Sequence, residues 1–363
     1  MATLTLVAAP PPVWADQVRD AQWHLDYLKI TQAHAITRGA GVTVAVLDSG
    51  VDAQHPDLKG AILPGANLTI LKEGSPVGWT DEDGHGTAMS GLIAAQGKAG
   101  SGALGIAPEA KVLPIRLQTD RTTPVSGFEE ALKIATARGA KVVNMSFGSP
   151  TFDSINADAV AAAQAADLVL VAASGNAPDD KTIGYPASYP GVITVGAVDR
   201  KGNHADYSLS GEQIMLTAPG TDITSTDIKR NNASGYSAGP GTSNSAAIVS
   251  GAVALVRAKY PQLTAAQVVE RITSTATDKG PKGRDPEYGY GVIDVMAALT
   301  APLEEAPAPA TAAPVPPGSG ADAPSDKDGL PTAALAAIGG GALLLVGTLA
   351  VLVVLIRRRR IAT

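Results

Sequence analysis

Four short stretches of the sequence carry side chains suited to acid–base and nucleophilic chemistry. Asp48 stands in LDSGVDAQHPDL, His85 in DEDGHGTAMSGLIAAQ and Asn176 in AASGNAP, while GPGTSNSAAIVSG at 239–251 holds three serines. A serine hydroxyl becomes a strong nucleophile when a histidine accepts its proton and a carboxylate orients that histidine. An asparagine amide can donate a hydrogen bond to an oxyanion. Acyl transfer is therefore one chemistry that these residue types could support.

Each stretch also has a simpler interpretation. An Asp followed by Ser-Gly, such as Asp48, most often caps a turn, and the serine-rich stretch could be a turn leading into a closely packed helix of small residues. Asp81, Asp83 and His85 could bind a metal ion, although acidic clusters on loops are more often solvated. What decides between these alternatives is where the fold places the four stretches.

Short apolar segments rich in β-branched residues alternate with helical segments between Gly39 and Leu299. GFEEALKIATARG is typical of a helix, and the predicted buried strands are 42–47, 111–117, 141–145, 168–172 and 192–196. Nearly continuous apolar strands separated by helices indicate an α/β fold with a mainly parallel sheet covered by helices on both faces. Active sites in such sheets lie at the carboxyl ends of the strands.

Asp48, His85, Asn176 and Ser243 each fall at such a position. Asp48 and Asn176 follow predicted strands, whereas His85 and Ser243 lie at the starts of predicted helices. Backbone N–H groups and the positive end of the helix dipole meet at a helix start, and both favour a developing negative charge. Four such placements in the order Asp, His, Asn and Ser favour one shared crevice over four unrelated turns.

Residues 39–300 resemble the subtilisin-like serine proteases (peptidase S8). The matching stretches are VAVLDSGVD with HPDL, GHGTAMSG, LGIAPEAKV, NMSFGS, AASGN and GTSNSAAIVSG, and the order Asp, His, Ser is that of subtilisin. The resemblance implies a subtilisin-like three-layer fold and a serine endopeptidase that acts on protein or peptide substrates without a catalytic cofactor. It assigns the triad to Asp48, His85 and Ser243, the oxyanion hole to Asn176, and the substrate-binding edge to Ser146, Phe147 and Gly148.

The nucleophile's helix departs from the family pattern Gly-Thr-Ser-Met-Ala-x-Pro at three positions. Asn244, Ser245 and Ala247 replace the Met, the Ala and the Pro. Ser245 and Ala247 keep the side chains small, but Asn244 adds a polar group beside Ser243. These departures leave open a second function, in which a catalytically weak subtilisin-fold subunit binds or scaffolds the components of a secretion complex. A calcium-dependent adhesin would leave the ordered Asp, His, Asn and Ser unexplained.

Composition excludes several other classes of protein. The chain has 28 basic and 34 acidic residues, a net charge of −6, and therefore no global basic field for nucleic acid. An aromatic content of 4% argues against a stacking platform for single strands. Because there is no cysteine, disulfides, thiolate metal ligands and cysteine nucleophiles are excluded. No stretch of the sequence indicates a structural calcium ion, so the sequence leaves open whether one binds.

Both ends of the chain predict a membrane-bound protein. Residues 332–356 form an uncharged apolar run longer than the ~20 residues that a transmembrane helix needs. The basic tail 357–363 contains RRRR and is expected to stay cytoplasmic, which places the catalytic domain outside the cell. The Pro/Ala-rich segment 301–331 is typical of a linker, and 1–15 resembles a truncated signal peptide.

A narrower resemblance covers the flanks of the domain. ADQVRDAQWHLDYL before it, GYGVIDVMAAL at its end, the linker and the single membrane helix resemble the mycosins, membrane proteases associated with type VII secretion in actinobacteria. This resemblance implies a single-pass protein of the cell membrane and makes the type VII secretion machinery a candidate partner. The extension 16–38 is too short to fold alone, so we expect it to wrap the catalytic domain without covering the crevice.

Overall fold

The computed structural model describes residues 14–69, 74–97, 101–118 and 125–302. Within these ranges every helix is too short or too polar to cross a lipid bilayer. Residues 1–13 of the predicted signal peptide 1–15 and residues 303–331 of the predicted linker 301–331 lie outside the described residues. The predicted membrane helix 332–356 and basic tail 357–363 lie wholly outside them.

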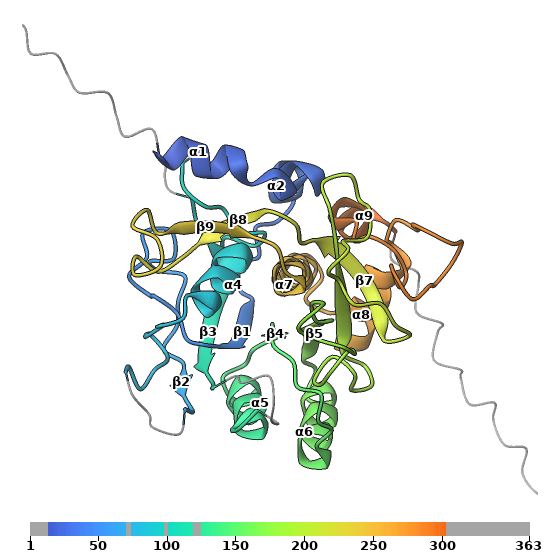
Figure 1. The fold of residues 1–363 in the computed structure, drawn as a ribbon, viewed down its shortest axis with the longest axis horizontal. Helices are drawn as coiled ribbons and strands as arrows, with labels where there is room; N and C mark the ends of the chain where they lie inside the picture. Colours follow the sequence, from blue (N-terminus) through green and yellow to red (C-terminus); the bar gives the residue numbers. More distant parts are fainter. Residues whose placement is uncertain (1–13, 70–73, 98–100, 119–124, 303–363) are drawn as a thin grey trace, which may run out of the picture. The chain divides into compact units, whose positions relative to one another are not determined.

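A seven-stranded sheet forms the middle layer, with every neighbouring pair of strands parallel (Figure 1). Its order is β2-β3-β1-β4-β5-β6-β7. The strands are β1 Thr43–Asp48, β2 Ala66–Asn67, β3 Lys111–Arg116, β4 Val142–Met145, β5 Val169–Ala173, β6 Ile193–Val198 and β7 Ile214–Pro219. A separate antiparallel hairpin consists of β8 Ile223–Thr226 and β9 Tyr236–Gly239.

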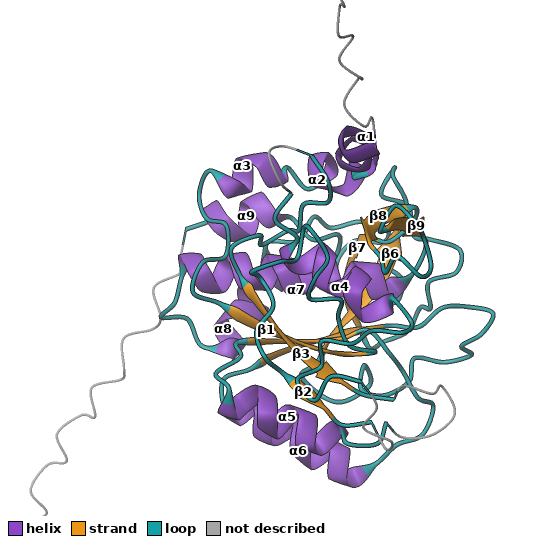
Figure 2. Cartoon of the chain, turned by 90° about the vertical axis from the view of Figure 1, so that its left-hand side faces the viewer, coloured by secondary structure: helices purple, strands orange, loops and turns teal. Residues whose placement is uncertain are grey.

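Helices cover both faces of the sheet. Figure 2 shows α5 and α6 below it and α4, α7 and α9 above it. α8 packs into the same half of the core as α7. The longer helices are α4 His85–Ala94, α5 Phe128–Ala137, α6 Ser154–Ala165, α7 Thr242–Lys259 and α8 Ala265–Ser274. The shorter ones are α1 Trp14–Ala21, α2 Trp23–Tyr27, α3 Ile30–His34 and α9 Val295–Thr300. The predicted α/β fold with a parallel middle layer is therefore confirmed.

Alternate residues of each strand supply the two halves of the core. On β1, Val44 and Val46 pack with α4 and α7, whereas Ala45 and Leu47 pack with α5 and α6. This two-sided burial explains why the strands read as continuous apolar runs. Gly251 lets α7 lie close to the rest of the core, because a Cβ there would stand 2.6 Å from that of Ile106.

The five predicted strands are all present, each within two residues of its expected ends. β2, β7 and the β8–β9 hairpin were not predicted. β2 is only two residues long, and the hairpin strands ITST and YSAG are too polar to give an apolar pattern. Polar side chains suit β8 because Ser225 and Thr226 donate to carbonyls of α4.

The N-terminal extension lies along the catalytic domain, as predicted. Gln22 donates to the Leu104 and Thr224 carbonyls and accepts from the Leu104 N–H, and Trp23 Nε1 donates to the Thr221 carbonyl. None of its described residues lines the cleft described below. The extension therefore wraps the domain and leaves the crevice open.

Candidate active site

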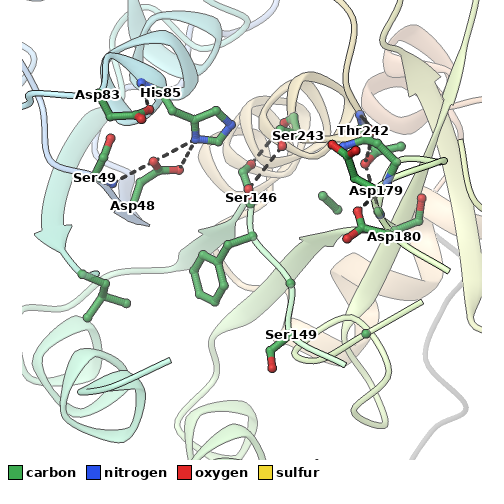
Figure 3. A pocket seen from close by; sticks show the side chains of 18 of the residues that line it. Asp48, Ser49, Asp83, His85, Ser146, Ser149, Asp179, Asp180, Thr242 and Ser243 are labelled. Carbon is green, nitrogen blue, oxygen red and sulfur yellow. Dashed lines mark hydrogen bonds and ion pairs between the residues drawn. The ribbon is translucent and has the colours of Figure 1, made fainter. Parts of the chain in front are cut away.

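A cleft of about 890 Å³ opens at the carboxyl ends of β1, β4 and β5 (Figure 3). Its lining includes all seven residues that the sequence predicts for the site: Asp48, His85, Ser146, Phe147, Gly148, Asn176 and Ser243. The sheet brings together residues that are separated by almost 200 positions in the chain. The shared crevice inferred from the motif order is therefore present.

Asp48 and His85 form a directly bonded pair. Asp48 is the last residue of β1 and is 3% exposed, and His85 begins α4. The His85 Nδ1–H donates to both carboxylate oxygens, at 2.9 and 3.0 Å. Because this bond requires the proton on Nδ1, the lone pair of a neutral ring lies on Nε2. In Figure 3 the ring stands between Asp48 and Ser243, with its second nitrogen facing Ser243.

Two opposing effects set the pKa of His85. Burial alone lowers it, whereas the charge of Asp48, the hydrogen bond to Asp48 and the charges of Asp83 and Asp81 raise it, to about 9 overall. The side chain is nevertheless 36% exposed, so water screens part of this attraction. The direction shows that the site stabilises the imidazolium form, which a general base needs after it has accepted a proton.

The carboxylate of Asp81 connects the segment that carries Asp48 with the segment that carries His85. Its oxygens accept five hydrogen bonds, from the Ser49 hydroxyl, the Asp83 and Gly84 N–H groups, and the Thr87 N–H and hydroxyl. Ser49 adjoins Asp48, and the other donors lie beside His85. Asp81 therefore fixes the loop after β1 relative to the first turn of α4.

The hypothesis of a metal site at Asp81, Asp83 and His85 is wrong. Asp81 is saturated by donors, and the Asp83 Oδ1 accepts from the His85 N–H. Across the described ranges no group of three or more His, Cys, Asp and Glu side chains could hold a metal ion.

Ser243 lies in the first turn of α7 and is half-buried. Its hydroxyl donates to the Ser146 carbonyl at 3.2 Å and makes no hydrogen bond with His85. The Ser243 backbone N–H has no acceptor among the residues that the structure describes. It is one of the free donors that every helix start provides.

Asn176 follows β5, and its amide is held in one orientation. The Thr242 N–H and hydroxyl both donate to the Asn176 Oδ1, at 2.9 and 3.1 Å. Because a backbone N–H can only donate, the amide oxygen must face Thr242. The Asn176 Nδ2 is left with no partner in the described part of the chain, and its backbone N–H donates to Asp180. Asn176 and Ser243 thus offer two unused N–H donors in one cleft.

The segment after β4 forms one wall of the cleft. Ser146 is 5% exposed, and Phe147 packs edge-on against Phe128. A Cβ added at Gly148 would have no atom within 4 Å, so the space beside Gly148 is open. Its backbone continues to Ser149, which pairs with Tyr185 as an isolated bridge. An open edge of this kind can accept an extended peptide.

The three departures in α7 point away from the cleft. The Asn244 Nδ2 donates to the Gly239 carbonyl at 3.1 Å, and the Ser245 hydroxyl lies within 3.2 Å of the Ala218 and Pro219 carbonyls. Ala247 is fully buried. None of the three lines the cleft. The polar replacements therefore bond to neighbouring backbone and make no hydrogen bond to the Ser243 hydroxyl.

Comparison with known proteins identifies the family of this chain. The model of the subtilase family matches residues 39–291. The chain belongs to the subtilase family. Subtilisin DY from Bacillus licheniformis is 38% identical to this subtilase over 265 residues, which make up 72% of the chain and 92% of the relative. The chain is accordingly a serine-type endopeptidase and needs no catalytic cofactor.

Solved structures add the mycosins. MycP1 from Mycobacterium smegmatis aligns with a TM-score of 0.66 and 31% identity, over 81% of this chain and 89% of that one. The MycP3 protease from the type VII (ESX-3) secretion system aligns with a TM-score of 0.66 and 32% identity, over 77% and 88%. The mycosin resemblance is thus borne out at the level of the fold.

Sequence reasoning missed the residues that hold the site in place. Asp81 was seen only as a metal ligand or a solvated acid. Thr242 was not singled out, and neither was Asn144, whose Nδ2 donates to the Ser146 hydroxyl at 3.0 Å. Asn144 carried a usable signal, since a lone amide inside the apolar strand VVNM needs a buried partner.

Proposed function

We propose that this subtilase hydrolyses peptide bonds with Ser243 as nucleophile, His85 as general base and Asp48 as the acid that orients His85. The observation that carries the proposal is the His85 Nδ1–H bond to both Asp48 oxygens, which leaves the Nε2 lone pair on the side of Ser243. The two unused donors, the Asn176 Nδ2 and the Ser243 N–H, support an oxyanion hole.

Catalysis begins with an extended substrate on the edge Ser146–Gly148. The Ser243 hydroxyl leaves the Ser146 carbonyl and turns to the His85 Nε2, which takes its proton as the oxygen attacks the scissile carbonyl. The Asn176 amide and the Ser243 N–H bind the oxyanion. His85 then protonates the leaving amine as the C–N bond breaks, which leaves an ester on Ser243. Water, deprotonated by the same histidine, hydrolyses the ester.

The proposed location is the cell membrane, with a single span at 332–356, the catalytic domain outside and the tail 357–363 in the cytoplasm. The apolar run and the RRRR that follows it support this location. The MycP3 protease is described as part of a type VII secretion system. We therefore propose that this chain also acts beside type VII secretion machinery, on protein or peptide substrates.

Labelling of the full chain with a fluorophosphonate tests the proposal, because only an activated serine reacts rapidly. We expect fast labelling of the unchanged chain, none for Ser243→Ala and unchanged labelling for Ser245→Ala, a matched buried serine two residues away. Proteolysis should follow the same pattern. A folded chain that labels slowly or not at all would favour the scaffolding function, and labelling lost only in Ser245→Ala would refute the choice of nucleophile.

A further inference from the structure

Three buried polar side chains form a chain of hydrogen bonds beneath Ser243. Ser250 on α7 lies 3.0 Å from the Asn144 Oδ1, the Asn144 Nδ2 lies 3.0 Å from the Ser146 Oγ, and the Ser146 Oγ lies 3.1 Å from the Ser243 carbonyl oxygen. Ser250 and Asn144 are 0% exposed. We call Ser250, Asn144 and Ser146 the relay.

With the Asn144 amide oriented as it is in the structure, the donors and acceptors of the relay can be arranged in one way only. The Asn144 Nδ2 must donate, so the Ser146 Oγ accepts from it. The Ser243 carbonyl must accept, so the single proton of Ser146 goes there. The amide oxygen of Asn144 then faces Ser250, whose proton is shared with the Ala246 carbonyl at 2.8 Å.

This arrangement fixes the hydroxyl of Ser146 beside the nucleophile. Its proton is directed to the backbone carbonyl of Ser243 and is not available to the Ser243 Oγ, whose nucleophilicity a hydrogen bond would reduce. The Ser243 hydroxyl in turn donates to the Ser146 carbonyl, at 3.2 Å. The two reciprocal bonds tie the first turn of α7 to the start of the edge Ser146–Gly148.

The surroundings of the relay are apolar. The strand neighbours of Asn144, Val46 on β1 and Val171 on β5, are buried apolar residues of the same half of the core, and side chains of that kind would fill the same space without polar groups to satisfy. Buried polar networks add little net stability, yet each member costs free energy if its partner is lost. Accurate placement of a nucleophile, in contrast, strongly affects the rate of the reaction.

We propose that Ser250 and Asn144 are positioning residues that act through Ser146 on Ser243. The proposal rests on the proposed function of Ser243 and deepens it. Removal of the Ser250 hydroxyl leaves the Asn144 oxygen unpaired and frees its amide to rotate. The Ser146 hydroxyl is then no longer held toward the Ser243 carbonyl.

The test is a double-mutant cycle in the full chain with a chromogenic peptide amide as substrate. We expect Ser250→Ala to lower kcat by about 2- to 10-fold, the factor to which one neutral hydrogen bond converts, with KM unchanged. Active sites are counted by fluorophosphonate titration, so unfolded protein does not enter kcat. Because Ser250 acts through Ser146, the pair Ser250→Ala and Ser146→Ala should have no lower kcat than Ser146→Ala alone.

Ser245→Ala is the matched control. It removes a buried hydroxyl from the same helix, but that hydroxyl bonds to carbonyls at the end of β7 and not to the relay. We expect it to leave kcat unchanged, alone and combined with Ser146→Ala.

Three outcomes would overturn the relay. They are an unchanged kcat in Ser250→Ala, additive losses with Ser146→Ala, or an equal loss in Ser245→Ala, which would mean that any disturbance of the helix has the same effect. An active unchanged chain with any of these results refutes the relay alone. A chain that neither cleaves peptides nor reacts with the fluorophosphonate refutes the proposed function and the relay together.

Discussion

Substitution of Asn176 separates the catalytic role of its amide from its structural role, because the two ends of the amide have different tasks. The Oδ1 accepts from the Thr242 N–H and hydroxyl, and Thr242 is fully buried. The Nδ2 has no partner among the described residues and is available to an oxyanion. A variant that keeps one end and changes the other therefore distinguishes the two roles.

Asn176→Ala removes both ends. Loss of the donor should lower kcat by about 10² to 10³, a range known for one oxyanion donor in subtilisin, with KM nearly unchanged because the bond forms fully only in the transition state. Loss of the acceptor leaves a buried Thr242 N–H unpaired, which should lower the free energy of unfolding by about 1–3 kcal/mol.

Asn176→Asp keeps an acceptor for Thr242 and replaces the donor with a carboxylate. We expect a loss of kcat at least as large as that of Asn176→Ala, because a negative charge would face the forming oxyanion, together with nearly unchanged stability. Steady-state kinetics on a peptide amide and urea unfolding measure the two effects. If Asn176→Ala raises KM and spares kcat, or if Asn176→Asp keeps its activity, the oxyanion hole lies elsewhere.

Three further changes test other parts of the site. His85 must be neutral to accept a proton, and its pKa is raised from 6.5 to about 9. We therefore expect kcat/KM to increase with pH through a midpoint above 6.5, with about 9 as an upper bound because the ring is partly exposed. A midpoint at or below 6.5 would contradict the attraction by Asp48. Asp81→Asn places an NH₂ group against donors from Ser49, Gly84 or Thr87. It should lower kcat and reduce the free energy of unfolding, measured by urea unfolding, by about 1–3 kcal/mol. Glu129→Gln, which changes an exposed ion pair on a helix, is the control and should change neither quantity. Deletion of 332–363 should release an active domain from the membrane fraction, and loss of folding would place the apolar run in the core.

The sequence was sufficient for the parts of the molecule that depend on local pattern. Strands such as VTVAVL and LVLVA are buried on both faces and are recognisable without any knowledge of their neighbours. The positions of Asp48 and His85 followed from the strand end and the glycines around them. Only glycine fits at position 50, directly after the end of β1, because its φ is +111° and a Cβ would stand 2.0 Å from the Thr80 carbonyl oxygen.

Contacts between distant residues could not be predicted in the same way. Thr242 orients Asn176 across 66 positions of the chain, and Asp81 works through Ser49, 32 positions before it. A run such as DEDG has the same composition whether its carboxylates face solvent, a metal ion or the donors of a helix start. Only the fold decides which partners are present, so the metal hypothesis for Asp81 failed although the position of His85 was right.

The substitutions in α7 show why a changed motif need not mean a changed reaction. Judged by sequence, Asn244 beside Ser243 raised the prospect of a weakened nucleophile. In the fold, adjacent helical residues point in different directions, so the Asn244 amide bonds to Gly239 while Ser243 faces the cleft. Ser245 and Ser250 likewise direct their hydroxyls to buried acceptors. The small polar residues of this helix therefore give it hydrogen bonds to β4, β7 and β9 that hydrophobic side chains of similar size could not provide, and the bond to β4 is the one that leads through Ser146 to the turn that carries Ser243.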